Sequence, residues 1–326
     1  MKKILALLLA LWIPAAVLSG CAPQDDSAAS NKLNIVTTIF PAYDWVREIL
    51  GDETDRAEIT MLLDSGVDLH SYQPTVDDIV KISDCDLFLY VGGESDGWVD
   101  DALKNAPSKE RKVIRLLDVL GDSAKAEETV EGMQEEEHDH EEEAEYDEHI
   151  WLSLKNAQVL VAAISEALQQ TDPARKDTYA ANAAAYVEKL SALDGEYRAA
   201  VDSGKYKTLL FGDRFPFRYL ADDYGLDYYA AFPGCSAETE ASFETVSFLA
   251  GKMDALGLPC VLTIEGTQHK IAETVVQNTA QKNQQILTMD SMQAVTANDA
   301  SSGVSYLSIM EKNLSVLKKA LGQEAE

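Results

Sequence analysis

The sequence predicts an α/β protein with two lobes, each a mostly parallel sheet with flanking helices, joined by one long helix. Short β-branched runs alternate with helical patterns over residues 33–117, and the alternation resumes beyond residue 205. Between these regions, residues 153–203 carry almost no strand pattern and are rich in Ala, Leu, Lys and Glu. Strands that alternate with helices are typical of parallel sheets covered by helices on both faces.

The same patterns place the individual elements and the boundaries. We expect a first lobe over 33–170, a linking helix over 171–204 whose pattern runs from Pro173 to Val201, and a second lobe over 205–326. The expected strands are 33–40, 58–64, 86–93, 112–117, 208–212, 226–232, 259–266 and 285–290. The other expected helices are 41–51, 74–83, a helix from about Trp98, 217–224, 240–256, 267–281 and 303–321.

The N-terminus predicts export from the cytoplasm. Residues 1–21 have a basic start, a short apolar run and a small-residue ending, as a secretory signal peptide does. The LSGC stretch at the end resembles the lipobox of bacterial lipoproteins, which implies a lipid on Cys21, a flexible tether over 22–32 and anchoring to the outer face of the cell membrane. An uncleaved anchor helix, or a plain secretory signal with an unmodified Cys21, stays open.

The charge of the chain favours cations as partners. The formal net charge is −29, and many of the acidic residues lie in a loop over 122–148. Such a charge argues against nucleic acid as a partner, because phosphates would be repelled. Outside the N-terminus, the chain has the cysteines Cys85, Cys235 and Cys260, none in a C-x-x-C motif, and we assign no chemistry to them.

Four polar residues follow expected strands or the acidic loop, namely His70, His149, Asp213 and Asp290. Ligands of open parallel sheets bind beyond the carboxyl ends of the strands, so two facing lobes would place such ends around one cleft. Imidazole nitrogens and carboxylate oxygens are the ligand types expected of zinc or manganese. We therefore expect a metal site in the interlobe cleft.

Several segments resemble one known family. GVDLHSYQPTVDDIVKISDCDLFLYVGG and DEHIWLSLKNAQVL are similar to two motifs of the zinc- and manganese-specific solute-binding lipoproteins of ABC transporters, the cluster A-I family. FRYLADDYGLDYYAAFPGCSAETEAS and EGTQHKIAETVVQNTAQKNQQILTMDSM resemble two later segments of that family. The likeness runs from about Asn34 to Leu321.

The resemblance implies a ligand set. His70 and His149 match the family's first two histidine ligands, and Asp290 matches its carboxylate ligand. For each residue an ordinary structural role stays open. His70 would then only cap the following helix, His149 would be an exposed loop histidine, and Asp290 would be a turn aspartate bonded to its own backbone.

The sequence departs from the family at the remaining ligand. Arg214 stands where the family has His or Glu, and a guanidinium has no lone pair for a cation. The neighbouring Asp213 is therefore the candidate fourth ligand. Its alternative is an N-cap for a helix that begins at Arg214. Water or a residue of the acidic loop is a further option.

Other residues are expected to support the site. Glu240 fits a glutamate of the family that would hold a ligand imidazole or the interlobe hinge, with surface exposure as the alternative, and Glu265 is expected to play a similar part. His138 and His140 lie among carboxylates of the acidic loop, where they would collect metal ions at the rim of the cleft.

The sequence thus predicts a monomeric extracytoplasmic binding protein that captures a divalent transition metal ion and delivers it to an ABC permease. Histidine ligands favour zinc, and the two carboxylates keep manganese as the alternative. We do not expect an enzyme. A secreted zinc-dependent hydrolase is the alternative from another class, but the sequence has neither H-E-x-x-H nor H-x-x-E-H. An added role as an adhesin also stays open.

Overall fold

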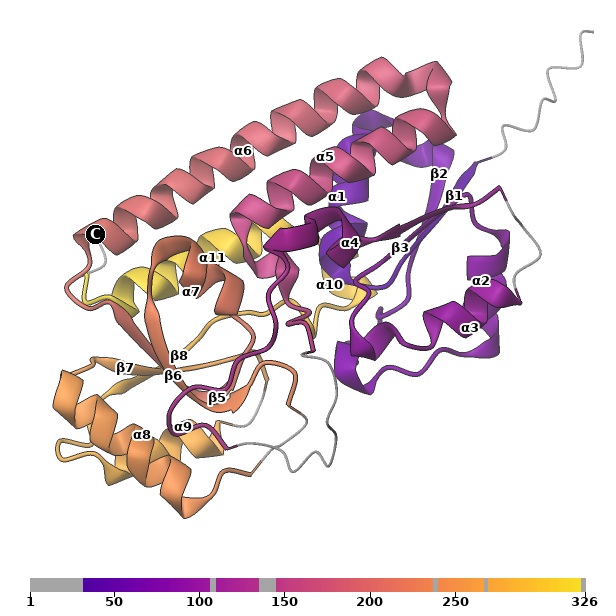
Figure 1. The fold of residues 1–326 in the computed structure, drawn as a ribbon. Helices are drawn as coiled ribbons and strands as arrows, with labels where there is room; N and C mark the ends of the chain where they lie inside the picture. The colour runs from indigo at the N-terminus through magenta and orange to yellow at the C-terminus, as the bar shows by residue number, and fades with distance from the viewer. Residues whose placement is uncertain (1–31, 106–109, 135–144, 237–239, 267–268, 324–326) are drawn as a thin grey trace, which may run out of the picture. The chain divides into compact units, whose positions relative to one another are not determined.

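The computed structural model describes residues 32–105, 110–134, 145–236, 240–266 and 269–323 (Figure 1). They belong to a compact unit that begins at Lys32. Within these ranges, each helix is too short or too polar to cross a membrane. The expected signal peptide, Cys21 and nearly all of the tether lie outside the described residues, as do His138 and His140.

The first lobe contains a four-stranded parallel sheet in the order β2-β1-β3-β4. Its strands are β1 (Leu33–Thr37), β2 (Ala57–Met61), β3 (Leu87–Tyr90) and β4 (Lys112–Arg115). Its helices are α1 (Phe40–Leu50), α2 (Val76–Asp84), α3 (Val99–Lys104) and the short α4 (Leu116–Leu120). Thr75 and Asp78 form a capping box at the start of α2, which explains why this helix begins after Pro74.

The second lobe repeats this topology with the strand order β6-β5-β7-β8, again all parallel. The strands are β5 (Thr208–Phe215), β6 (Asp227–Pro233), β7 (Cys260–Thr263) and β8 (Gln285–Thr288). The helices are α7 (Arg218–Tyr224), α8 (Phe243–Leu256), α9 (Lys270–Asn278), α10 (Ala297–Ser301) and α11 (Tyr306–Ala320). The predicted fold of two parallel sheets with flanking helices is therefore confirmed.

Two long helices connect the sheets. α5 (Leu154–Thr171) and α6 (Lys176–Ser203) pack along each other, and α6 contacts both α1 and α11 (Figure 1). The helix α6 begins later than expected because Pro173–Arg175 form a 3₁₀ turn. Its large buried side chains follow a spacing of three and four residues, which produces one apolar stripe: Tyr179, Ala183, Tyr186, Leu190, Leu193 and Tyr197.

A buried hydrogen-bonded chain ties the last helix to the first lobe. The backbone N–H of Tyr306 in α11 donates to Asp44 of α1 at 2.8 Å, and the Tyr306 hydroxyl donates to the carbonyl of Trp151 at 2.7 Å. Trp45 packs edge-on against the Tyr306 ring. These contacts fix the segment that carries His149.

The structure corrects the expected end of β5. The sequence predicts a strand over 208–212, but β5 continues to Phe215, and α7 begins only at Arg218. Pairing with β6 holds the extension, because Arg214 and Phe215 lie opposite Phe232 and Pro233 after an irregularity in register. Asp213 is thus a strand residue rather than a helix N-cap.

The acidic segment, which the expected boundaries assign to the first lobe, has described contacts with the second lobe. Its described part packs on the second lobe: the N–H of Gln134 donates to Ala231 in β6, and Glu131 pairs with Lys252 in α8. Ala126 and Tyr146 form an isolated antiparallel bridge between the two arms of the segment. The segment therefore connects the His149 region to the second sheet.

Candidate metal centre

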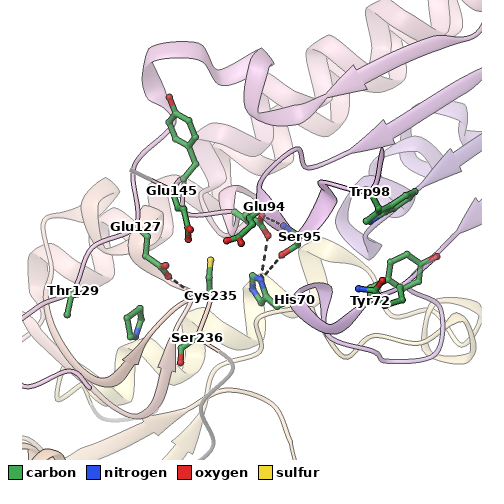
Figure 2. A pocket seen from close by; sticks show the side chains of 14 residues that line it. His70, Tyr72, Glu94, Ser95, Trp98, Glu127, Thr129, Glu145, Cys235 and Ser236 are labelled. Atoms are coloured by element: carbon green, nitrogen blue, oxygen red, sulfur yellow. Dashed lines mark hydrogen bonds and ion pairs between the residues drawn. The ribbon is translucent and has the colours of Figure 1, made fainter. Parts of the chain in front are cut away.

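Two histidines and one cysteine converge from distant parts of the chain. His70 lies in a 3₁₀ turn after β2, His149 directly precedes a 3₁₀ turn before α5, and Cys235 follows β6. One ligand atom from each of the three lies within 4.8 Å of the other two. Figure 2 shows the His70 ring and the Cys235 sulfur on neighbouring parts of one cavity wall.

The two imidazoles present the same nitrogen to each other. The Nε2 atoms of His70 and His149 lie 3.3 Å apart. In a tetrahedral zinc site with Zn–N bonds of about 2.0–2.1 Å, two imidazole nitrogens lie about 3.3 Å apart. The pair therefore already has the spacing of two ligands on one ion.

The opposite edge of each ring is held by protein oxygens. His149 Nδ1 lies 2.9 Å from Asp147 Oδ1, and His70 Nδ1 lies 2.8 Å from Ser95 Oγ and 3.5 Å from Glu148 Oε2. A carboxylate accepts only, so Asp147 places the proton of His149 on Nδ1. Ligating histidines typically donate their second N–H to such an oxygen, which leaves the Nε2 lone pair for a metal.

Burial and charge set the protonation of the site. Burial, together with the neighbouring imidazole of His149, lowers the pKa of His70 to about 3. Burial also opposes a charged His149, but contact with Asp147 outweighs it and raises the pKa of His149. Burial raises the pKa of Glu148, whose Oε2 has no hydrogen-bond partner within the described ranges. The site thus holds a neutral His70 and several buried acceptors, an environment that favours a cation.

Local backbone geometry brings the ligand candidates into place. Asp68 caps the turn of His70 by accepting its backbone N–H at 3.0 Å. Gly234 passes so close to the His149 ring that a Cβ at this position would lie 3.2 Å from the ring and 2.9 Å from the Phe215 carbonyl. Glycine therefore lets the loop after β6 approach His149.

A second series of contacts supports His149 through the neighbouring Trp151 ring. The His149 and Trp151 rings have centroids 5.3 Å apart, and Trp151 Nε1 donates to the Ser291 carbonyl at 2.9 Å. The N–H and hydroxyl of Ser291 both donate to Glu265, at 2.6 and 2.7 Å. Glu265 is thus connected to the His149 segment through Ser291 and Trp151, and its expected part in supporting the site stays a prediction.

Asp290 and Asp213 lie outside the group of His70, His149 and Cys235. Asp290 Oδ1 accepts the N–H of Met292 at 2.8 Å, the turn arrangement that was its alternative. Asp213 accepts the N–H of Arg214 at 2.9 Å and that of Ile264 at 3.3 Å, because it sits inside β5 beside β7. Neither carboxylate is grouped with the histidine pair among the described residues, and their role as metal ligands stays a prediction.

Arg214 has a different role from the family ligand that it replaces. Its guanidinium donates to Asp68 Oδ2 at 2.6 Å and to the carbonyl of Ser236 at 3.2 Å. Asp68 belongs to the turn of His70, and Ser236 follows Cys235. Arg214 thus joins the two segments that carry ligand candidates from opposite lobes. Glu240, in contrast, is exposed, as its surface alternative predicts.

An acidic cavity of about 590 Å³ opens beside His70 and Cys235 (Figure 2). Its wall includes His70, Tyr72, Gln73, Glu94, Ser95, Trp98, Glu127, Thr129, Glu145, Tyr146, Glu148, Pro233, Cys235 and Ser236. Carboxylates on several sides of one cavity raise the local concentration of cations. Cys235 belongs to the group with His70 and His149 but was not indicated by the sequence patterns, although it lies three residues after the end of an expected strand.

Comparison with known proteins agrees with this architecture. The family model "Zinc-uptake complex component A periplasmic" matches residues 35–320. The zinc-binding lipoprotein AdcA of Streptococcus pneumoniae is 34% identical over 329 residues, which cover 99% of this chain and 62% of AdcA. The high-affinity zinc uptake system protein ZnuA of Bacillus subtilis is 30% identical over 299 residues. The match covers 89% of this chain and 88% of that protein.

A solved structure gives the same result. The Zn(II)-bound ZnuA-like domain of S. pneumoniae AdcA superimposes with a TM-score of 0.70 at 30% identity, covering 90% of this chain and 100% of that domain. The chain spans about 62% of the length of the full AdcA sequence. On these matches, the resemblance seen in the sequence motifs is confirmed, and the chain belongs to the ZnuA family of zinc-uptake complex components.

Proposed function

We propose that this protein captures a divalent transition metal ion, with zinc favoured over manganese, and delivers it to an ABC permease for uptake. The observation that carries the proposal is the pair of Nε2 atoms, 3.3 Å apart, on histidines whose Nδ1 atoms are already bonded. The metal is cargo, and no bond of a substrate needs to break. The names of the relatives, a zinc-binding lipoprotein and a zinc uptake system protein, support zinc as that cargo.

We propose that capture takes place outside the cytoplasm. The apolar N-terminal segment and the LSGC stretch support cleavage before Cys21 and a lipid on this residue. The monomer would then stay on the outer face of the membrane, close to the permease that accepts the ion. The acidic cavity and the loop with His138 and His140 would raise the metal concentration near the site.

Equilibrium dialysis against zinc tests the proposal. We expect about one tightly held zinc ion per chain in the wild type, as a single mononuclear site implies. His70→Ala and His149→Ala should each abolish tight retention, whereas His269→Ala, a histidine outside the group, should leave it unchanged. Absence of tightly bound zinc in the wild type would overturn the proposal.

The same dialysis experiment tests which metal ion is bound and whether Asp213 and Asp290 are ligands. Dialysis against equal zinc and manganese should load zinc, and retained manganese would support the alternative cargo. Asp213→Ala and Asp290→Ala are included because the sequence proposed both as ligands. Loss of zinc from either variant would support that carboxylate as a ligand, as the family resemblance implies for Asp290. Retention by both would leave them to the backbone N–H groups that they accept.

A further inference from the structure

We infer that Cys235 is a ligand of the captured ion, and that its thiolate makes the site select soft transition metals such as zinc and discriminate against manganese. This inference rests on the proposed metal-binding function and names a third ligand for the same site. The sulfur belongs to the one group of three His, Cys, Asp or Glu ligand atoms that the described residues bring within 4.8 Å. It also faces the cavity through which an ion would arrive (Figure 2).

The loop that carries Cys235 is held in position by its neighbours. Glu127 Oε1 accepts the backbone N–H of Cys235 at 2.8 Å, so one arm of the acidic segment holds this loop by a hydrogen bond. Arg214 holds the following residue, Ser236, through its carbonyl. Gly234 permits the close approach to His149. Two hydrogen bonds and the absence of a Cβ at Gly234 thus place this sulfur beside the histidines.

The other candidates for this ligand position are not grouped with the two histidines among the described residues. Arg214 has no lone pair to offer and is paired with Asp68. Asp213 and Asp290 both lie outside the group of ligand atoms within 4.8 Å of one another. Glu148 approaches His70 on the Nδ1 side, opposite the nitrogen that faces His149. Cys235 is therefore the donor that the structure offers to the space next to both Nε2 atoms.

Coordination by Cys235 is a proton exchange without oxidation or reduction. The S–H bond breaks, the sulfur donates its electron pair to the metal ion, and the proton leaves through the cavity to solvent. A thiolate is a soft ligand that favours zinc, whereas manganese prefers carboxylate and water oxygens. Replacement of an oxygen ligand by sulfur therefore shifts the preference of the site towards zinc.

The remaining described cysteines provide matched controls. Cys85 and Cys260 are free and buried, and neither belongs to the histidine group. Cys85 lies just before β3, and Cys260 begins β7. A variant with Cys21→Ser, Cys85→Ala and Cys260→Ala leaves Cys235 as the last cysteine of the chain.

Cobalt(II) is the probe, because a cobalt–thiolate bond produces a near-ultraviolet charge-transfer band that nitrogen and oxygen ligands do not. The wild type and the triple variant should both bind cobalt and show the band. Addition of Cys235→Ser should remove the band and weaken zinc retention by at least about tenfold, since loss of even a supporting group costs that much. Competition between zinc and manganese should become less selective.

The outcomes separate the two proposals. Cobalt bound by the wild type without the band would overturn the inference and leave the proposed function standing. No metal bound by the wild type would overturn the proposed function itself. If Cys235→Ser does not fold, the triple variant decides alone: the band in that protein assigns the thiolate to Cys235, and its absence from the folded, cobalt-loaded triple variant contradicts the assignment.

Discussion

The Nε2 atoms of His70 and His149 lie 3.3 Å apart, and Asp147 holds the second of these rings through its Nδ1 atom at 2.9 Å. When His70 also carries its proton on Nδ1, donating it to Ser95, both Nε2 lone pairs point at the same region. Two lone pairs at this distance repel each other, and an ion between them replaces this repulsion by two coordinate bonds. The packing of the site therefore favours cation binding before any ion arrives.

Asp147→Asn should weaken zinc binding by about 10–100-fold, the usual cost of losing a group that orients a ligating histidine. The amide keeps the size of the side chain but removes the charge that fixes the tautomer. Competition with a chelator of known affinity measures the change. Asp254→Asn is the control, because this exposed carboxylate near the end of α8 accepts the N–H of Ala280 and lies outside the group that contains His70 and His149. Equal affinities of Asp147→Asn and the wild type would show that the contact is irrelevant to binding.

Zinc affinity should fall more steeply with decreasing pH once His149 begins to bind a proton. The pKa of His149 is raised above its ordinary 6.5, so this change should begin above that value, whereas His70 stays neutral until about pH 3. Removal of the Asp147 charge lowers the pKa of His149. Titrations of apparent affinity against pH should thus show the break at lower pH in Asp147→Asn, and a break that does not move would contradict the assignment.

Glu265→Gln should destabilise the folded protein by about 1–3 kcal/mol, because the carboxylate accepts three short hydrogen bonds from Ser291 and Gln293. An amide can accept only through its single oxygen. Urea unfolding of the metal-free protein measures the difference. Glu240→Gln is the matched control, and as a change at an exposed residue it should stay within about 0.5 kcal/mol of the wild type. An equal decrease in the free energy of unfolding in both variants would show that Glu265 does not support the fold through these hydrogen bonds.

Asp44→Asn should alter the pH dependence of stability. Burial raises the pKa of Asp44 from 3.8 to about 6, so between these values the native state binds more protons than the unfolded state. The contribution of Asp44 to stability is therefore present below pH 4 and is lost as the pH rises towards 6. The loss amounts to about 1–3 kcal/mol, since a tenfold difference in proton affinity between the folded and unfolded states corresponds to about 1.4 kcal/mol.

The difference in unfolding free energy between Asp44→Asn and the wild type isolates this effect from the other carboxylates. The asparagine can still accept the Tyr306 N–H. Its advantage over the wild type should increase from pH 4 to pH 6 and then stay constant. A difference that is flat over this range would mean that Asp44 titrates normally.

The fold could be predicted from the sequence to a large extent, because its signals are local. β-Branched runs that alternate with helical patterns place all eight strands and the long α6. The end of β5 could not be predicted, since Asp213 and Pro216 resemble a helix start. The strand continues because β6 offers partners opposite Arg214 and Phe215, and that pairing depends on contacts remote in sequence.

The site was predictable only in part for the same reason. His70 and His149 are recognisable because a motif surrounds each of them. Cys235 reaches the site through the extension of β5, the glycine before it and the acidic arm that binds its backbone, none of which a linear pattern reveals. The docking of that arm on β6 and α8 is likewise a tertiary contact between distant segments.

The central claim is that His70 and His149 share one ion. Anomalous diffraction at the zinc edge from crystals of the zinc-loaded protein tests it most directly. The account predicts a single strong peak about 2.0–2.1 Å from both Nε2 atoms. A zinc peak elsewhere on the chain, or contact with only one of the two imidazoles, would contradict it.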